Sequence, residues 1–139
     1  MTTQSGSLML LKVYNVENKN FEIVGGMRTT KFLLNNQLID NTTKESGKWR
    51  ELLPEAGQSH ISICGTGIFT DKNSELIVRN AAFDNRALSF RLSFANGDIL
   101  LGMFLIDVYE RVGNMEEEEQ YNVGLESSGK VSYESETLN

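Results

Sequence analysis

The alternation of apolar and polar residues predicts a chain built mainly of β-strands. The clearest segment is residues 87–95, where Leu88, Phe90, Leu92 and Phe94 share one face and Ser89, Arg91 and Ser93 share the other. Asn96-Gly97 follows and favours a tight hairpin turn, because both residues tolerate positive φ. The return strand is predicted from residue 98 to 109 or 112, roughly 46 Å at 3.3 Å per residue. Such a strand is unusually long, so it either bends at Gly102 or projects from the body.

Shorter apolar runs predict further strands at residues 8–16, 21–24, 27–34, 37–40, 59–69 and 121–125. Asn35-Asn36 is a plausible tight turn between two of them. In residues 59–69, Ile61, Ile63 and Gly65 are expected on one face and His60, Ser62 and Cys64 on the other. We expect His60 at the strand surface and Cys64 as a small buried apolar residue.

One helix is predicted between the strands. Asp71 is a natural N-cap and Glu75 lies favourably in the first turn. Apolar residues follow at helical spacing, namely Leu76, Ile77, Val78, Ala81, Ala82 and Phe83. The helix is expected to end near residues 84–85.

Residues 41–57 follow neither the strand period nor the helix period, and they contain the only tryptophan of the chain. Long unpatterned segments inside a compact domain are usually functional or mobile. Two placements stay open for Trp49, Leu52 and Leu53: folded back on the core, or offered to a neighbouring chain. The second placement is attractive because Trp and Arg are enriched at interface hot spots.

A length of 139 residues fits one domain. The predicted organisation is a flexible N-terminus at 1–7, a β domain at 8–129 and a polar tail at 130–139 that has little reason to order alone. The apolar run at residues 8–11 is too short for a signal peptide or a membrane span, so we expect a reducing cytosol. The fold class is mainly β (α+β), an antiparallel sandwich or barrel with one flanking helix and a long hairpin or loop arm.

Candidate chemistry is sparse. One cysteine and one histidine exclude an intrachain disulfide and most zinc sites. Gly65-Thr66-Gly67 lacks the third glycine of a dinucleotide-binding turn, and we expect a strand-end bend there instead. Asp107 is the one acid inside an apolar run, where it is explained as part of a polar strand face. The net charge of −6 comes without a basic stripe for phosphates. We predict no enzyme, no metal and no cofactor.

Several segments, taken in order, resemble a known family. They are GKWRELLPEAG at 47–57, ISICGTGIFTD at 61–71, AAF at 81–83, NGD at 96–98 and YNVGLESSG at 121–129. In order and spacing, residues 25–133 resemble the small major tail tube proteins of long non-contractile phage tails, and the tail proteins of gene transfer agents. Two departures are Cys64, where a small residue such as Ser is expected, and an unusually acidic run at residues 116–119.

The resemblance implies a structural virion protein, found in the virion tail after assembly in the bacterial cytoplasm. Six copies would form a ring whose inner sheets join into one barrel, and stacked rings would form a tube for DNA. The implied partners are the chain itself and the tape-measure, tail tip and terminator proteins. DNA would pass without specific binding, and no membrane is involved.

On this basis residues 41–57 are expected to make inter-subunit or inter-ring contacts, with Trp49, Arg50, Leu52 and Leu53 central. The long return strand is expected in the lumen-side sheet, with Asp98, Leu100, Asp107 and Tyr109 as candidates and neither face assigned. Two alternatives stay open. One is a secretion-type tube protein of similar fold, and the other is a monomeric β-barrel that binds a small apolar ligand.

Overall fold

The computed structural model describes residues 9–135, so the predicted flexible segment 1–7 lies outside the described part. The main antiparallel sheet contains β1 (Leu10–Asn15), β2 (Asn20–Ile23), β3 (Met27–Asn36), β6 (Ser59–Ile68), β7 (Leu88–Ser93), β8 (Ile99–Asn114), β9 (Glu117–Ser127) and β10 (Ser132–Glu134). A separate small ribbon pairs β4 (Ile39–Asp40) with β5 (Leu52–Leu53), and the one α-helix of the described residues is α1 (Asn73–Asp84). The mainly β prediction is confirmed.

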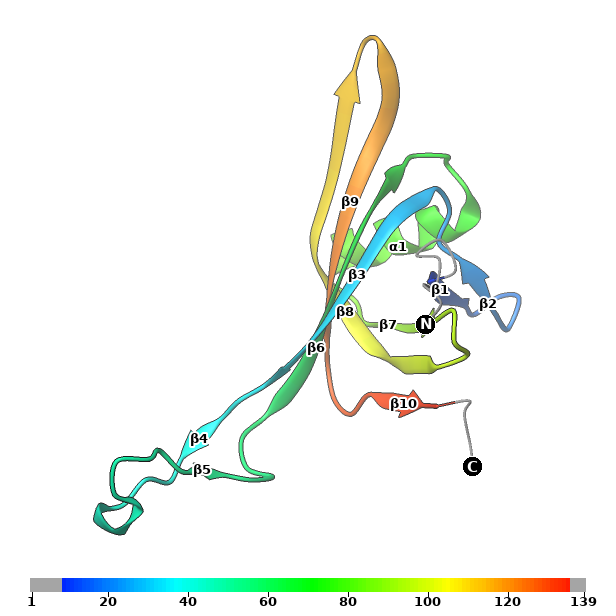
Figure 1. Cartoon of the computed structure of the whole chain (residues 1–139). Coiled ribbons are helices and arrows are strands. Elements are labelled where there is room, and N and C mark those ends of the chain that lie inside the picture. The colour runs from blue at the N-terminus through cyan, green and yellow to red at the C-terminus, as the bar shows by residue number, and fades with distance from the viewer. Residues whose placement is uncertain (1–8, 136–139) are drawn as a thin grey trace.

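The strand order in the main sheet is β2-β1-β7-β8-β9-β6-β3, with β10 beside β8. The sheet curls like an incomplete barrel, because β1, the second strand of this order, comes near β3 at the far end. Strand β8 joins its two halves: residues 99–104 pair with β7, and residues 104–114 pair with β9 (Figure 1).

The core lies on the concave face of the sheet and under α1. It is formed by alternate residues of the long strands, as the sequence pattern predicts. The fully buried members include Val13, Ile63, Phe90, Leu92, Leu100, Phe104, Tyr121 and Leu125, together with Val78 and Ala81 of the helix. Phe90 and Phe104 meet edge to face with ring centroids 6.1 Å apart.

The helix begins later than predicted. Asp71 is in the left-handed region with φ of 56°, and Lys72 is the N-cap. The start of α1 is held by the buried carboxylate of Glu75, which accepts hydrogen bonds from the backbone N–H of Thr70 (3.0 Å) and Lys72 (3.3 Å) and from the Thr70 hydroxyl. A buried carboxylate needs such donors to offset its desolvation. Asn85 ends the helix in the left-handed region, as expected near residues 84–85.

Gly65 and Gly67 lie inside β6, so the predicted strand-end bend is wrong. A Cβ atom on Gly67 would lie 2.2 Å from the carbonyl oxygen of Gly26, so only glycine allows β3 and β6 to come this close here. The adjacent Gly25 carbonyl accepts a 2.5 Å hydrogen bond from the hydroxyl of Tyr121. These contacts fix the start of β3 against the sheet.

Three further predictions need correction. Asn35-Asn36 is not a turn, because β3 continues through it toward β4. The tail is not wholly without structure, since Ser132–Glu134 pairs with Leu101, Leu100 and Ile99 of β8. Cys64 is exposed and not buried. Its neighbours Ile63 and Gly65 face the core, so strand alternation places the thiol on the opposite face whatever its preference for burial.

Adjacent leucines of β8 give a matched test of this alternation. Leu100 is fully buried, whereas Leu101 is 38% exposed. We expect Leu100→Ala to lower the free energy of unfolding by about 2–5 kcal/mol, because it leaves a cavity in the core. Leu101→Ala is expected to cost less than about 1 kcal/mol. Urea unfolding followed by circular dichroism measures both, and equal costs would contradict the assigned faces.

Alkaline pH provides a second test. Burial is the main cause that raises the pKa of Tyr121. Above pH ~10 an unfolded tyrosine loses its proton, whereas Tyr121 keeps it in the folded chain. The contribution of Tyr121 to the free energy of unfolding is therefore fully present below pH ~10 and is lost as the pH rises toward the folded pKa. We expect Tyr121→Phe to be less stable at pH 8 and to have a flatter decline of stability between pH 10 and 11. Urea midpoints across this range measure it, and parallel declines would contradict it.

Candidate assembly interface

Four strands form an elongated ladder with a projection at each end. In the order β8-β9-β6-β3, Asn36 pairs with Ser59 at one end of the β3–β6 pair, and Ile68 pairs with Gln120 toward the other. From Ser59 to Ile68 the ladder spans about 30 Å. Beyond the first end lies the arm, residues 37–58, and beyond the second lies the β8–β9 hairpin apex. Figure 1 shows the two projecting in opposite directions.

The arm has local structure of its own although it lacks a sequence period. The Asn41 N–H donates to the Glu51 carbonyl at 2.9 Å, and the Thr42 hydroxyl accepts from the Glu51 N–H at 2.9 Å. Thr43 caps a short 3-10 helix (Lys44–Ser46). These bonds are polar and short-range, which explains how a segment without a hydrophobic period adopts a defined shape.

The β8–β9 hairpin extends beyond the core and is stabilised by charged side chains. Arg111 on β8 donates two hydrogen bonds to the carboxylate of Glu119 on β9, at 2.5 and 2.9 Å. The same guanidinium lies 3.8 Å from the ring centroid of Phe69. The hydrogen bond to Arg111 lowers the pKa of Glu119, and the bond to Glu119 raises the pKa of Arg111. Two register shifts, at residues 106–108 and 112–114, bend the hairpin.

The face of the ladder opposite the core is mainly polar. Strand alternation places on it Thr29, Lys31, Leu33 and Asn35 of β3, His60, Ser62, Cys64 and Thr66 of β6, Asn122, Gly124 and Glu126 of β9, and Val108, Glu110 and Val112 of β8. His60 Nε2 lies 4.0 Å from a Glu126 carboxylate oxygen, so His60 is at the strand surface as predicted. This face has mixed charge and no run of basic groups.

Within the described residues, the β8-β9-β6-β3 ladder has two stretches of strand edge without a strand partner. One is the outer edge of β3, whose only partner is β6. The other is the edge of β8 from residue 105 onward, because β7 ends its pairing at Phe104. Beside this second edge is a groove of about 230 Å³ lined by Ala82, Phe83, Ile106, Asp107 and Tyr109. Phe83 is 81% exposed there, at the C-terminal end of α1.

The predicted contact residues of the arm are all exposed. Trp49 is 73% exposed and does not fold back on the core, which removes one of the two placements considered. Arg50, Leu52 and Leu53 are also exposed, and Lys48 Nζ lies 5.5 Å from the Trp49 ring centroid. An exposed tryptophan beside two cations is the composition expected of an interface anchor.

The predicted lumen residues of β8 and its turn are not on one face. Leu100 is buried in the core, so its side chain cannot line a lumen. The Asp98 carboxylate accepts a 2.6 Å hydrogen bond from Tyr133 at the β7–β8 turn. Tyr109 is half-buried against Tyr121, with ring centroids 6.4 Å apart. Asp107 differs: its carboxylate lies over Gly124, on the face opposite the core.

Sequence reasoning missed three exposed apolar residues, two of them outside the arm. The helical spacing places Phe83 on the apolar face of the helix, and no pattern marks Met115, which lies fully exposed at the hairpin apex. Leu38 is 66% exposed at the base of the arm. No sequence signal separates these residues from core positions, because their exposure depends on where neighbouring elements end.

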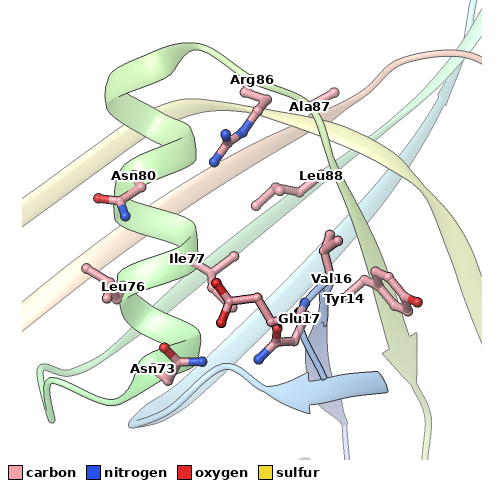
Figure 2. A pocket seen from close by; sticks show the side chains of 11 residues that line it. Tyr14, Val16, Glu17, Asn73, Leu76, Ile77, Asn80, Arg86, Ala87 and Leu88 are labelled. Carbon is pink, nitrogen blue, oxygen red and sulfur yellow. Dashed lines mark hydrogen bonds between the residues drawn. The ribbon is translucent and has the colours of Figure 1, made fainter. Parts of the chain in front are cut away.

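A groove of about 560 Å³ lies between α1, the β1–β2 turn and the start of β7 (Figure 2). Val16, Leu76, Ile77 and Leu88 give it an apolar wall, and Arg86 is among its polar residues. Val16 is 72% exposed, so the groove is at the surface and not inside the curled sheet. This is the position where a small-ligand hypothesis would have to place its ligand.

Residues 9–135 contain no group of three or more His, Cys, Asp or Glu side chains placed to hold a metal ion. Within the same residues, no helix is both long and apolar enough to cross a membrane.

Comparisons with known proteins agree with one another. Residues 3–133 match the family described as phage tail tube protein. The tail of an empty gene transfer agent (GTA) particle, refined with C6 symmetry, is 31% identical, with a TM-score of 0.89 over 96% of this chain and 100% of that one. The virion of a native GTA particle has a chain that is 31% identical over the same shares, with a TM-score of 0.86.

The SPP1 tail tube is more distant. It is 14% identical over 96% of this chain and 80% of that one, and its TM-score of 0.74 shows a shared fold. No curated protein sequence matches. The family match covers nearly the whole chain, and the 31% identical GTA structures extend over their full length. The chain belongs to the phage tail tube protein family.

Proposed function

We propose that the chain is a major tail tube subunit that closes into rings of six and stacks as a conduit for DNA. The observation that carries the proposal is the pair of unpartnered strand edges on opposite sides of the β8-β9-β6-β3 ladder. An exposed edge invites pairing with another strand, and a closed ring of identical copies satisfies both of these edges without open aggregation. Ring size is proposed from the C6 symmetry of the related GTA tail.

Within such a ring, the outer edge of β3 in one copy would pair with the free edge of β8, residues 105–114, in the next. The two are similar in length, since β3 has 10 residues. Phe83 lies beside the β8 edge and would be covered by the neighbour, which would remove its exposed ring from water. The junction between two copies would thus combine strand pairing with an apolar contact at Phe83.

The face opposite the core would then line the lumen. Asp107, Glu110 and Glu126 are the acids on this face of the ladder, and Lys31 is its one lysine or arginine among the described residues. A mildly acidic lining repels phosphates, whereas a basic lining would bind DNA through counterion release. DNA would therefore pass without being held.

The remaining partners follow from the same proposal. The tube would surround a tape-measure protein and be bounded by tail tip and terminator proteins, in a virion tail assembled in the bacterial cytoplasm. Its role would be structural and not enzymatic, which agrees with the tail tube family. A secretion-type tube would share these subunit contacts, and fractionation of intact producing cells separates the two, since only that tube would be exported.

Electron microscopy of the purified protein tests the proposal directly. At high concentration, or when seeded with tail tip proteins, we expect rings with six-fold symmetry and tubes built from them. A subunit that stays strictly monomeric under both conditions would count against the function. If the monomer's melting temperature then rose when a small apolar ligand was added, the result would favour the groove of Figure 2 as a binding site.

The exposed thiol of Cys64 tests which face lines the lumen. In isolated subunits we expect Cys64 to react with a small maleimide and with a polymer-linked maleimide alike. In tubes, the small reagent should still react, while the polymer should be excluded by at least about tenfold in rate because it cannot enter the lumen. A Lys19→Cys variant in a Cys64→Ser background is the outer-surface control and should react with both. Equal exclusion at both positions would contradict the assignment.

A further inference from the structure

A groove at the base of the arm has the features of a docking site for a second copy of this chain. We propose that it receives the apex of the β8–β9 hairpin from a copy in the adjacent ring. The proposal rests on the tube function above and names the two surfaces that would join one ring to the next. The groove has a volume of about 480 Å³ and is lined by Leu38, Leu52, Leu53, Pro54 and Ala56, among others.

The groove is open and held in shape, and five of its ten lining residues are apolar; the polar ones are Asn36, Gln37, Glu55 and Ser59. Leu38 is 66% exposed and Leu53 is 44% exposed. Two hydrogen bonds between Gln37 and Gln58 fix the base of the groove. The Gln37 N–H donates to the Gln58 carbonyl at 2.8 Å, and the Gln58 N–H donates to the side-chain oxygen of Gln37 at 3.1 Å. Gly57, at φ of 81°, lies so close to the Gln37 carbonyl that a Cβ there would be 2.3 Å from its oxygen. A preformed groove loses little conformational freedom on binding.

The hairpin apex provides an apolar residue that nothing in its own subunit covers. Met115 is fully exposed, and the turn that presents it is fixed by a 3.2 Å bond from the Glu116 N–H to the Asn114 side chain. Methionine adapts its shape to irregular apolar surfaces. Val112, 48% exposed on β8 below the apex, adds to the same apolar end.

The arm tip and the hairpin apex are opposite in net charge, although the arm as a whole is not basic: residues 37–58 carry three basic and four acidic side chains, and Glu55 is among the residues that line the groove. Residues 43–50 at the arm tip include three basic side chains, Lys44, Lys48 and Arg50, and one acidic side chain. Residues 110–119 of the hairpin include five acidic side chains and one basic side chain, Arg111, which is already paired with Glu119. Glu116, Glu117 and Glu118 are therefore left to interact with a partner. Complementary charge of this kind favours encounter and fixes orientation.

The geometry allows this contact between copies related by a shift along the strands. Arm and apex lie at opposite ends of one ladder, so a second copy placed beyond the first can bring its apex to the first copy's arm. Each copy offers one groove and one apex, which makes the contact head to tail. Head-to-tail contacts do not close by themselves and extend into a filament.

Disulfide trapping tests the contact. In a Cys64→Ser background, Leu53→Cys and Met115→Cys are made in separate chains and mixed under assembly conditions before mild oxidation. We expect a crosslinked dimer that forms only in the mixture. The matched control replaces Leu53→Cys with Val16→Cys, a position that is more open to solvent (72% against 44%) but lies away from both surfaces. Crosslinking at both sites to the same extent, or at neither in assembled tubes, would overturn the proposal.

Charge reversal tests its electrostatic part. Lys48→Glu with Arg50→Glu, or Glu116→Lys with Glu118→Lys, should each reduce ring stacking by more than about tenfold while leaving rings intact. All four changes in one chain should restore stacking, because the two surfaces are again opposite in sign. Lys19→Glu with Lys130→Glu, and Glu17→Lys with Glu134→Lys, are controls of equal charge change and should leave stacking unaltered.

The outcomes separate this inference from the proposed function. A wild-type chain that forms neither rings nor tubes contradicts the function itself. Tubes that form without the Leu53–Met115 crosslink would refute the docking site and leave the function standing. The same holds if the variant with all four substitutions stacks no better than either variant with two. An apex that is protected only by a tail tip protein would likewise refute the contact between copies.

Discussion

The edge of a β-strand carries N–H and C=O groups that only another strand satisfies fully, and the shape of this subunit is organised around that constraint. Strand β8 has different partners along its length: β7 and β10 pair with its first part, and β9 pairs with its second. Where β7 stops at Phe104, one edge of β8 is left open. The outer edge of β3 is open in the same way. The subunit is thus complete in its core and incomplete at its borders.

The two projections depend on that ladder for their positions. The close contact of Gly67 with Gly26 and the bond from Tyr121 to Gly25 fix β3 against the sheet at the end where the hairpin leaves it. At the other end, β3 and β6 stay paired as far as Asn36 and Ser59 and so carry the arm clear of the core. The core residues therefore decide where the exposed surfaces lie, although they touch no partner.

Much of the fold could be predicted from the sequence, because its strands have one buried face. The alternation of Leu88, Phe90 and Leu92, the Asn96-Gly97 turn and the single helix all follow from local pattern. The errors have a common cause in longer-range packing. Cys64 is exposed because of its place in the alternation, Gly67 is required by the approach of a neighbouring strand, and residues 132–134 pair with a strand some thirty positions earlier. For the interface, composition indicated Trp49, whereas Phe83 and Met115 gave no signal, since exposure depends on where other elements end.

The opposite placement of the arm, with its basic tip at residues 43–50, and the acidic hairpin has a consequence for any filament built from these subunits. Such a filament is polar: one terminus displays the arm tips, which carry Trp49, and the other displays carboxylate-rich turns. A factor that recognises one terminus by charge would be repelled by the other. Initiation and termination can therefore be assigned to different proteins, and the direction of growth is already encoded in a single polypeptide.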